Sequence, residues 1–202
     1  ELARLLELLL RPPELTVPVG ITVVADGAPS VAVTYAASAE DDVDGPVPVT
    51  CAPPSGFAFP VGTTTVICSA SDSAGNSASA SFSVHVLDIT PPVIESTVAG
   101  VLGDNGWYVG DVTLSWSVAD PESGIASSTG CDYVAVTADQ LETAYTCSAT
   151  NGAGLSASAS VAIKRDATAP TDVAGTASRA PDSGVWYNHA VDVTFSGADA
   201  TS

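Results

Sequence analysis

The sequence predicts an all-β protein built from tandem antiparallel β-sandwiches. Two observations carry this prediction: a long stretch of the chain repeats itself, and short runs rich in Val, Thr and Ile alternate with clusters of Gly, Pro, Asp and Asn. β-Branched residues favour extended chain, and turn residues at short intervals mark the ends of strands. Strands with one apolar face need a second sheet to cover that face, so many short strands in each repeat are typical of a sandwich.

The repeat has a constant displacement, the interval from Cys68 to Cys147, and the two runs that begin at these residues align without gaps. At the same interval Trp186 follows Trp107. Self-similarity at a fixed period indicates tandem modules. The chain is therefore expected to have four parts: a Leu-rich lead at 1–11, a first sandwich at 12–87, a second sandwich at 88–165, and the start of an incomplete third module at 166–202.

The expected strands are short runs with β-branched residues, several of them alternating between polar and apolar positions. In the first sandwich they lie at 20–24, 30–35, 63–68 and 80–86, and in the second at 112–118, 145–149 and 157–163.

The lead is the exception to the β pattern. Leu2, Leu5, Leu6, Leu9 and Leu10 fall on one face of a predicted short N-terminal helix, which Pro12-Pro13 would end. A helix of this length is marginal alone in water, so it is expected to pack on something. It is either a docking or oligomerisation helix or the end of a preceding domain.

Charge and hydropathy exclude several partners. The net charge is −18 with only 5 Lys and Arg, so the chain would repel the phosphates of DNA, RNA and anionic lipids. No apolar run approaches the roughly 18 residues of a membrane-spanning helix. A chain without Met is expected to be a processed product or a fragment.

The four cysteines form two similarly spaced pairs, Cys51 with Cys68 and Cys131 with Cys147. No Cys-x-x-Cys motif and no neighbouring His suggests zinc. One structural disulfide in each sandwich is therefore expected, and with it an oxidising, extracellular or cell-surface location.

The first repeat carries further motifs in a fixed order: Ala39-Glu-Asp-Asp-Val-Asp-Gly45, Val49-Thr-Cys51, Phe59-Pro-Val-Gly-Thr-Thr-Thr-Val66, and Asp72-Ser-Ala-Gly-Asn76. With these motifs the region from about residue 12 to 88 closely resembles the HYR (hyalin repeat) module. Residues 89–165 are similar to the Ig-like repeats of bacterial surface and secreted proteins. The resemblance implies extracellular immunoglobulin-like sandwiches that serve adhesion or act as spacers.

Acidic residues in two loops and a linker are candidate calcium ligands, because hard cations take several carboxylate and carbonyl oxygens at one point. Linker residues Asp88 and Asp166 could join such loops at a module boundary. The alternative is solvated charge with Asx turns, in which a side chain bonds its own backbone. The candidates are Asp41, Asp42, Asp44, Asp88, Asp120 and Glu122.

The recurring aromatic pairs Trp107-Tyr108 and Trp186-Tyr187 have two interpretations. They form an exposed, coplanar platform for carbohydrate, or they pack within each module. Recurrence at one position of the repeat favours packing, because a residue that builds the fold must recur in every module.

The sequence offers little for catalysis, since His85 and His189 are the only histidines and neither stands in a catalytic motif. No enzyme activity and no cofactor other than calcium is expected. The function expected is that of a non-catalytic structural or adhesive module, a stalk or spacer of a multi-domain surface or secreted protein. Its partners would be other modules of the same protein, surface proteins or polysaccharide.

Two alternatives remain open at this point. One is a carbohydrate-binding accessory module of a secreted enzyme. The other is a subunit of an extracellular filament that self-assembles through the N-terminal helix or the incomplete third module, whose open strand edge invites pairing.

Overall fold

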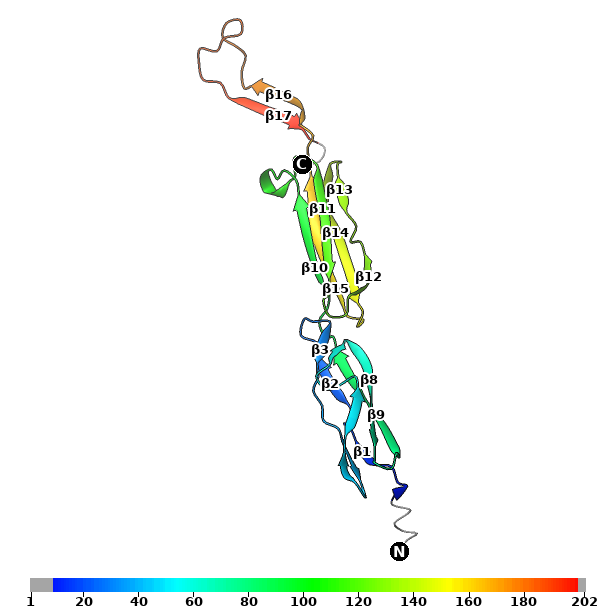
Figure 1. Ribbon diagram of the computed structural model, residues 1–202. Helices are drawn as coiled ribbons and strands as arrows, with labels where there is room; N and C mark the ends of the chain where they lie inside the picture. Colours follow the sequence, from blue (N-terminus) through cyan, green and yellow to red (C-terminus); the bar gives the residue numbers. More distant parts are fainter. Residues whose placement is uncertain (1–8, 200–202) are drawn as a thin grey trace. The chain divides into compact units, whose positions relative to one another are not determined.

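The computed structural model describes residues 9–199, which form two compact units (Figure 1). Unit 1 takes in the described residues up to Val93 together with Ala119–Ser127 and Ala149–Ala157. Unit 2 takes in Ile94–Val118, Ser128–Ser148 and the described residues from Ser158 onward. The expected helix at 1–11 falls almost wholly outside the described residues.

The strands of the first repeat all lie in unit 1. They are β1 (Glu14–Thr16), β2 (Ile21–Val24), β3 (Ser30–Ala32), β4 (Ser38–Asp41), β5 (Gly45–Val47), β6 (Val49–Ala52), β7 (Ala58–Pro60), β8 (Gly62–Ser71) and β9 (Ser77–Leu87). They form a four-stranded sheet in the order β2-β9-β8-β6, a three-stranded sheet β1-β4-β5 and the pair β3-β7.

One pairing differs from the antiparallel arrangement expected. β1 pairs antiparallel with β4, but β2 pairs parallel with β9, with Ile21 opposite Val84 and Val24 opposite Leu87. The chain leaves one sheet and enters another between β1 and β2, in a segment that contains Pro18 and Gly20. Pro18 cannot donate to a ladder, so the switch occurs where a continuous strand is disfavoured.

The core of the first repeat consists of apolar side chains that alternate along these strands. β9 shows the pattern: Phe82, Val84 and Val86 are buried, and the residues between them are not. The buried cluster is Ala25, Val33, Phe59, Val66, Cys68, Phe82, Val84 and Val86.

The second repeat supplies β10 (Val93–Ala99), a short 3-10 helix η1 (Asp104–Gly106), β11 (Val112–Ala119), β12 (Ile125–Thr129), β13 (Val134–Val136), β14 (Gln140–Asn151) and β15 (Ser156–Arg165). Its sheets are β10-β11-β13 and β12-β14-β15. Val112, Leu114, Val136 and Ile163 form its buried cluster.

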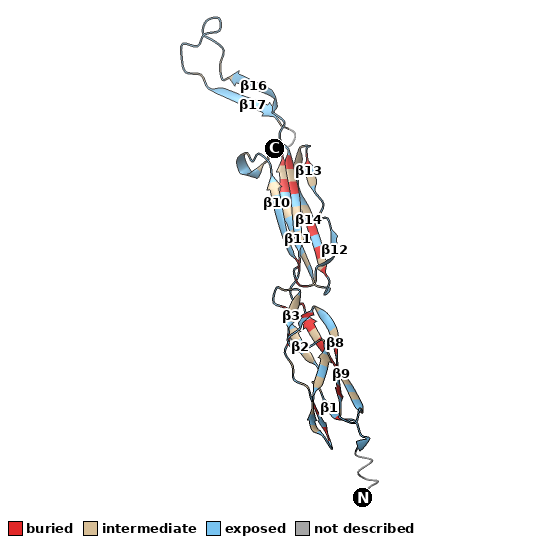
Figure 2. Cartoon of the chain, in the orientation of Figure 1, coloured by how far each residue is buried: buried red, intermediate tan, exposed pale blue. Residues whose placement is uncertain are grey.

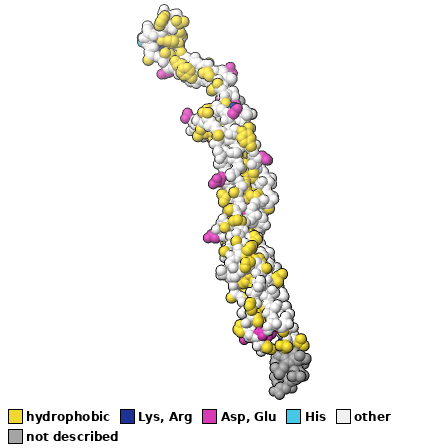
Figure 3. All heavy atoms as spheres, in the orientation of Figure 1, with side chains coloured by type: hydrophobic (Ala, Val, Ile, Leu, Met, Phe, Trp, Pro, Cys, Tyr) yellow, Lys and Arg dark blue, Asp and Glu magenta, His cyan; other side chains and the backbone are white. Residues whose placement is uncertain are grey.

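The third segment is a β-hairpin of β16 (Thr171–Ala177) and β17 (Val193–Ala198). None of its described residues from 166 to 199 is buried, and Figure 2 shows no red on its two strands. Figure 3 shows hydrophobic side chains gathered on this segment, and acidic side chains scattered over the visible face, this segment included. Among the described residues no helix is long and apolar enough to cross a membrane.

Candidate functional site

Two equivalent loops, one in each repeat, begin with an aspartate that caps its own backbone. After β4, Asp41 Oδ1 accepts hydrogen bonds from the amides of Val43 at 2.9 Å and Asp44 at 3.0 Å. After β11, Asp120 Oδ1 accepts from the amides of Glu122 at 3.1 Å and Ser123 at 2.9 Å. The repeat therefore preserves an Asx turn, which the alternative interpretation of the acidic loops predicted.

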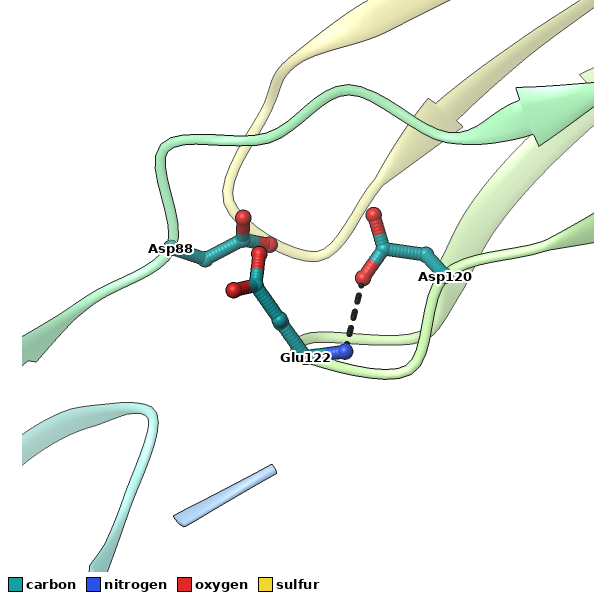
Figure 4. Close-up of side chains that lie close together, drawn as sticks. All are labelled: Asp88, Asp120 and Glu122. Atoms are coloured by element: carbon teal, nitrogen blue, oxygen red, sulfur yellow. Dashed lines mark hydrogen bonds between the residues drawn. The ribbon is translucent and has the colours of Figure 1, made fainter. Parts of the chain in front are cut away.

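The second of these loops belongs to unit 1, where it meets the linker that follows β9. Asp88, Asp120 and Glu122 each place a carboxylate oxygen within 4.8 Å of the others (Figure 4). All three residues are buried, Glu122 with only 4% of its surface exposed. Among the described residues this is the only group of three acidic, His or Cys side chains with this proximity.

The centre of the cluster is Asn151, which is 1% exposed. Its Nδ2 donates to Asp88 Oδ2 at 2.9 Å, to the carbonyl of Thr90 at 2.8 Å and to Asp120 Oδ2 at 3.0 Å. Its Oδ1 accepts from the amides of Ala153 and Leu155 and so closes the β14–β15 turn.

Asn151 precedes Gly152 in the sequence, and Asn in such a position is expected to be a turn residue that bonds its own backbone. Its contact with the linker was not expected from the sequence. Asn151 does close the turn, but its side-chain amide nitrogen also donates to three acceptors. The available signal was the position of Asn151 in the repeat, where the first module has Asp72 instead.

Both carboxylate oxygens of Glu122 accept hydrogen bonds. Its Oε1 accepts a hydrogen bond from the amide of Gly27 at 2.7 Å, and its Oε2 accepts one from the hydroxyl of Thr90. Gly27 lies in the β2–β3 loop with φ +73°, a conformation that glycine adopts without strain. Glu122 therefore ties the β2–β3 loop to the linker.

Asp88 is held by the same network. Its Oδ1 accepts from the Thr90 amide at 2.9 Å, and the hydroxyl of Ser123 donates to its Oδ2. Burial acts to raise the pKa of Asp88, but hydrogen bonds, led by that from Ser123, outweigh burial and hold the pKa below its usual value.

The cluster can bind a cation or remain a hydrogen-bonded network. Three carboxylates can each give one oxygen to a divalent ion such as calcium. Every carboxylate oxygen of the three also has a hydrogen-bond donor in the protein. The calcium hypothesis for Asp88, Asp120 and Glu122 stays a prediction.

The other three calcium candidates lie in the β4–β5 loop of the first repeat and are separately engaged. Asp42 pairs with Arg11 at 2.8 Å in an exposed ion pair. Asp44 accepts from both the amide and the hydroxyl of Ser73, and these two bonds hold the pKa of Asp44 below its usual value. Asp41 is buried, and its Oδ2 has no hydrogen-bond partner.

The linker at the other end of the second repeat uses a cation in place of the carboxylate cluster. Within unit 2, the buried guanidinium of Arg165 pairs with Asp139 at 2.6 Å and with Asp111 at 2.9 Å. Asp139 also accepts from the amide of Ala167 and the hydroxyl of Thr168. Asp166, the second linker aspartate, accepts from the amide of Thr168 at 3.1 Å.

The structure contains both expected disulfides, Cys51–Cys68 and Cys131–Cys147. Cys51 and Cys68 are register partners on β6 and β8. Cys68 and Cys147 are fully buried. Each repeat thus has a covalent link that begins in its core.

The four aromatic candidates lie in different surroundings. The Lys164 ammonium lies 5.0 Å from the ring centroid of half-buried Trp107, and Tyr108 packs against the core of the second repeat. Their counterparts in the hairpin segment are exposed: Trp186 is 77% accessible, and Tyr187 lies beneath Arg179. The two Trp-Tyr pairs therefore do not share one environment.

Comparison with known families gives one match. Residues 10–86 match the model of the HYR domain. The matched residues span β1–β9 except the last residue of β9. No family match covers the second repeat, and no curated protein matches the chain.

Several solved structures with some similarity are described as extracellular domains or ectodomains. The chain is 19% identical to the protocadherin gamma-B4 extracellular domain, with a TM-score of 0.35. The match covers 84% of this chain and 34% of the protocadherin chain. Protocadherin gamma-B2 cadherin domains 3–6 are 15% identical with a TM-score of 0.39, and the match covers 94% of this chain and 57% of that chain. The human desmocollin-1 ectodomain is 14% identical with a TM-score of 0.29, and the match covers 79% of this chain and 38% of that chain. The chain thus spans between about a third and three fifths of these structures.

Proposed function

We propose that this chain is a non-catalytic extracellular structural unit, a stalk or spacer of a multi-domain surface or secreted protein whose modules also serve adhesion. The HYR domain at 10–86 and the two disulfides support this assignment. Disulfides of this kind persist in oxidising compartments. Both repeats are proposed to be immunoglobulin-like sandwiches.

The observation that carries the proposal is the linker after β9. A flexible connection would leave its polar groups in water, whereas Asp88 is 8% exposed and accepts from Thr90, Ser123 and Asn151. Two of these donors come from loops of the second repeat. A spacer needs ordered linkers, because a flexible linker does not fix the distance between the modules that it joins.

Hydrogen exchange tests the proposal. The amide of Thr90, bonded to Asp88, is expected to exchange slowly in the intact chain and quickly in an Asn151→Ala variant. Unprotected exchange at Thr90 in the unmodified chain would contradict an ordered spacer. Light scattering over a range of concentrations gives the second readout: a monomer supports the spacer, and concentration-dependent association supports the filament subunit.

The carbohydrate alternative receives less support. One face of Trp107 is covered by Lys164, and Tyr108 contributes to packing. A platform would then rest on Trp186 and Tyr187 alone. Binding of the chain to a glycan array, lost on Trp186→Ala, would restore this alternative.

A further inference from the structure

The first repeat contains a buried carboxylate oxygen that the protein leaves without a partner. Asp41 is 5% exposed, and its Oδ2 is inaccessible to solvent and accepts no hydrogen bond. The equivalent atom in the second repeat, Asp120 Oδ2, accepts from Asn151 Nδ2 at 3.0 Å. A buried charged acceptor without a donor is strongly disfavoured, so this difference between the repeats needs a cause.

The cause lies in the residue that faces the aspartate. The displacement that aligns Asp41 with Asp120 aligns Asp72 with Asn151. Asp72 closes its turn as Asn151 does, since its Oδ1 accepts from the amide of the fourth residue on, Asn76, at 2.7 Å. The position of the Asn151 amide nitrogen is therefore taken in the first repeat by Asp72 Oδ2, which cannot donate.

The two loops are adjacent in the first repeat as they are in the second. The amide of Ser73 donates to Asp44 Oδ2 at 2.6 Å, and its hydroxyl donates to Asp44 Oδ1 at 2.9 Å. These bonds join the 72–76 turn to the 41–45 loop. The Asx turn occupies Oδ1 of Asp41 on its own backbone, as the equivalent turn occupies Oδ1 of Asp120, and Oδ2 is left for another partner. In Asp120 that partner is Asn151.

The carbonyl of Leu9 reaches the same 72–76 turn. Asn76 Nδ2 donates to Asp72 Oδ2 at 2.6 Å and to the carbonyl of Leu9 at 2.9 Å. One amide thus serves two of the oxygens, and no donor serves the third.

We infer that the first repeat holds a divalent cation, of the calcium class, between Asp41 and Asp72, with the carbonyl of Leu9 as a further oxygen ligand. Two carboxylates and a carbonyl are the ligands that a hard cation takes. The cation supplies the positive partner that Asn151 supplies in the second repeat. The site goes beyond the proposed function, because a spacer with an ordered linker does not require it.

The affinity expected is that of a weak extracellular site. Three protein oxygens leave the remaining coordination positions to water, and sites in extracellular modules have Kd values of about 10⁻⁴–10⁻³ M. Such a site would be filled outside the cell and empty where calcium is scarce.

Residue-resolved NMR of the full chain tests the site. Calcium chloride is added at constant ionic strength to about 10 mM, roughly ten times the upper end of that Kd range. The amides of Asp41, Asp72 and Asn76 are expected to shift together with one saturating curve. Shifts confined to Asp88, Asp120 and Glu122, or no saturable shift at all, would overturn the inference.

Asp72→Asn is the decisive variant, because it gives the first repeat the donor that the second repeat has. The calcium-dependent shifts at Asp41 and Asn76 should disappear, and the melting temperature in chelator should rise above that of the unmodified chain. Asp132→Asn removes the same charge from an exposed position and should change neither. If calcium shifts persist in Asp72→Asn, the site is wrong.

Discussion

Asn151 Nδ2 donates a hydrogen bond to Asp88 Oδ2 at 2.9 Å and thereby joins a hairpin turn to a linker 63 positions away in the sequence. The same amide reaches Thr90 and Asp120. Asn151 thus joins the hydroxyls of Ser123 and Thr90 as a neutral donor to the acidic side chains at this linker.

Replacing Asn151 with Ala should therefore lower the free energy of unfolding by about 2–3 kcal/mol, because Asp88 and Asp120 each lose a buried donor. Urea unfolding followed by circular dichroism measures the change. Asn188→Ala, at an exposed position, is the matched control and should stay within about 0.5 kcal/mol of the unmodified chain. Equal effects of the two substitutions would contradict the central position of Asn151.

Acid should destabilise unit 1 through Asp88. Its pKa in the folded chain is held below the value of the unfolded chain, about 3.9. A depressed pKa contributes stability that is present above the unfolded value and is lost as pH falls through the folded value. Unfolding measured between about pH 5 and pH 2 should show this loss, and Asp88→Asn should reduce it. An unchanged pH dependence in Asp88→Asn would place the acid sensitivity elsewhere.

The ion pairs of Arg165 should contribute more to the free energy of unfolding than the ion pair of Arg11. The Arg165 side chain is 10% exposed and bonds two carboxylates, whereas the pair of Arg11 with Asp42 is exposed on both sides. Arg165→Met should destabilise the chain by about 2–4 kcal/mol, because the half-buried carboxylate of Asp139 is left without its cation. Arg11→Met should change stability by less than about 1 kcal/mol.

A double variant refines the same test. If Arg165→Met acts by leaving the Asp139 carboxylate without a partner, the double variant Arg165→Met with Asp139→Asn should lose less free energy of unfolding than the two single variants lose in sum. Additive effects would mean that the two side chains act independently.

Each disulfide should contribute about 3 kcal/mol, since the bridged residues are 17 and 16 positions apart and a loop of about 15 residues loses that much unfolded-state entropy. Replacing Cys51 and Cys68 together with Ala should lower the melting temperature, and the Cys131 and Cys147 pair should behave alike. Added reductant should then affect only the bridge that remains. A variant with the melting temperature of the unmodified chain would show that the removed disulfide does not stabilise the fold.

Much of the local structure was predictable. Strands 63–68, 80–86 and 112–118 were placed within β8, β9 and β11, because their alternating β-branched residues bury one face. The expected strand at 30–35 ends early, at Ala32. The pairing of the cysteines followed from their similar spacing in the two repeats.

The parallel pairing of β2 with β9 could not be predicted in this way. Period-two alternation shows which side of a strand is buried, but it has no direction, so parallel and antiparallel neighbours leave the same pattern. The candidate site shows the same limit: the acidic residues were identified, but Asn151 was read only as a turn residue.

The sequence by itself determined the properties that are local or periodic: tandem repeats, an all-β fold and two disulfides, with Asx turns as one of two interpretations of the acidic loops. The tertiary structure alone decided which polar atoms meet. It set Asn151 against Asp88 and left Asp41 Oδ2 without a donor. The physical reason is that hydrogen bonds between distant segments depend on angstrom-scale positions set by packing, and residue spacing along the chain does not record those positions.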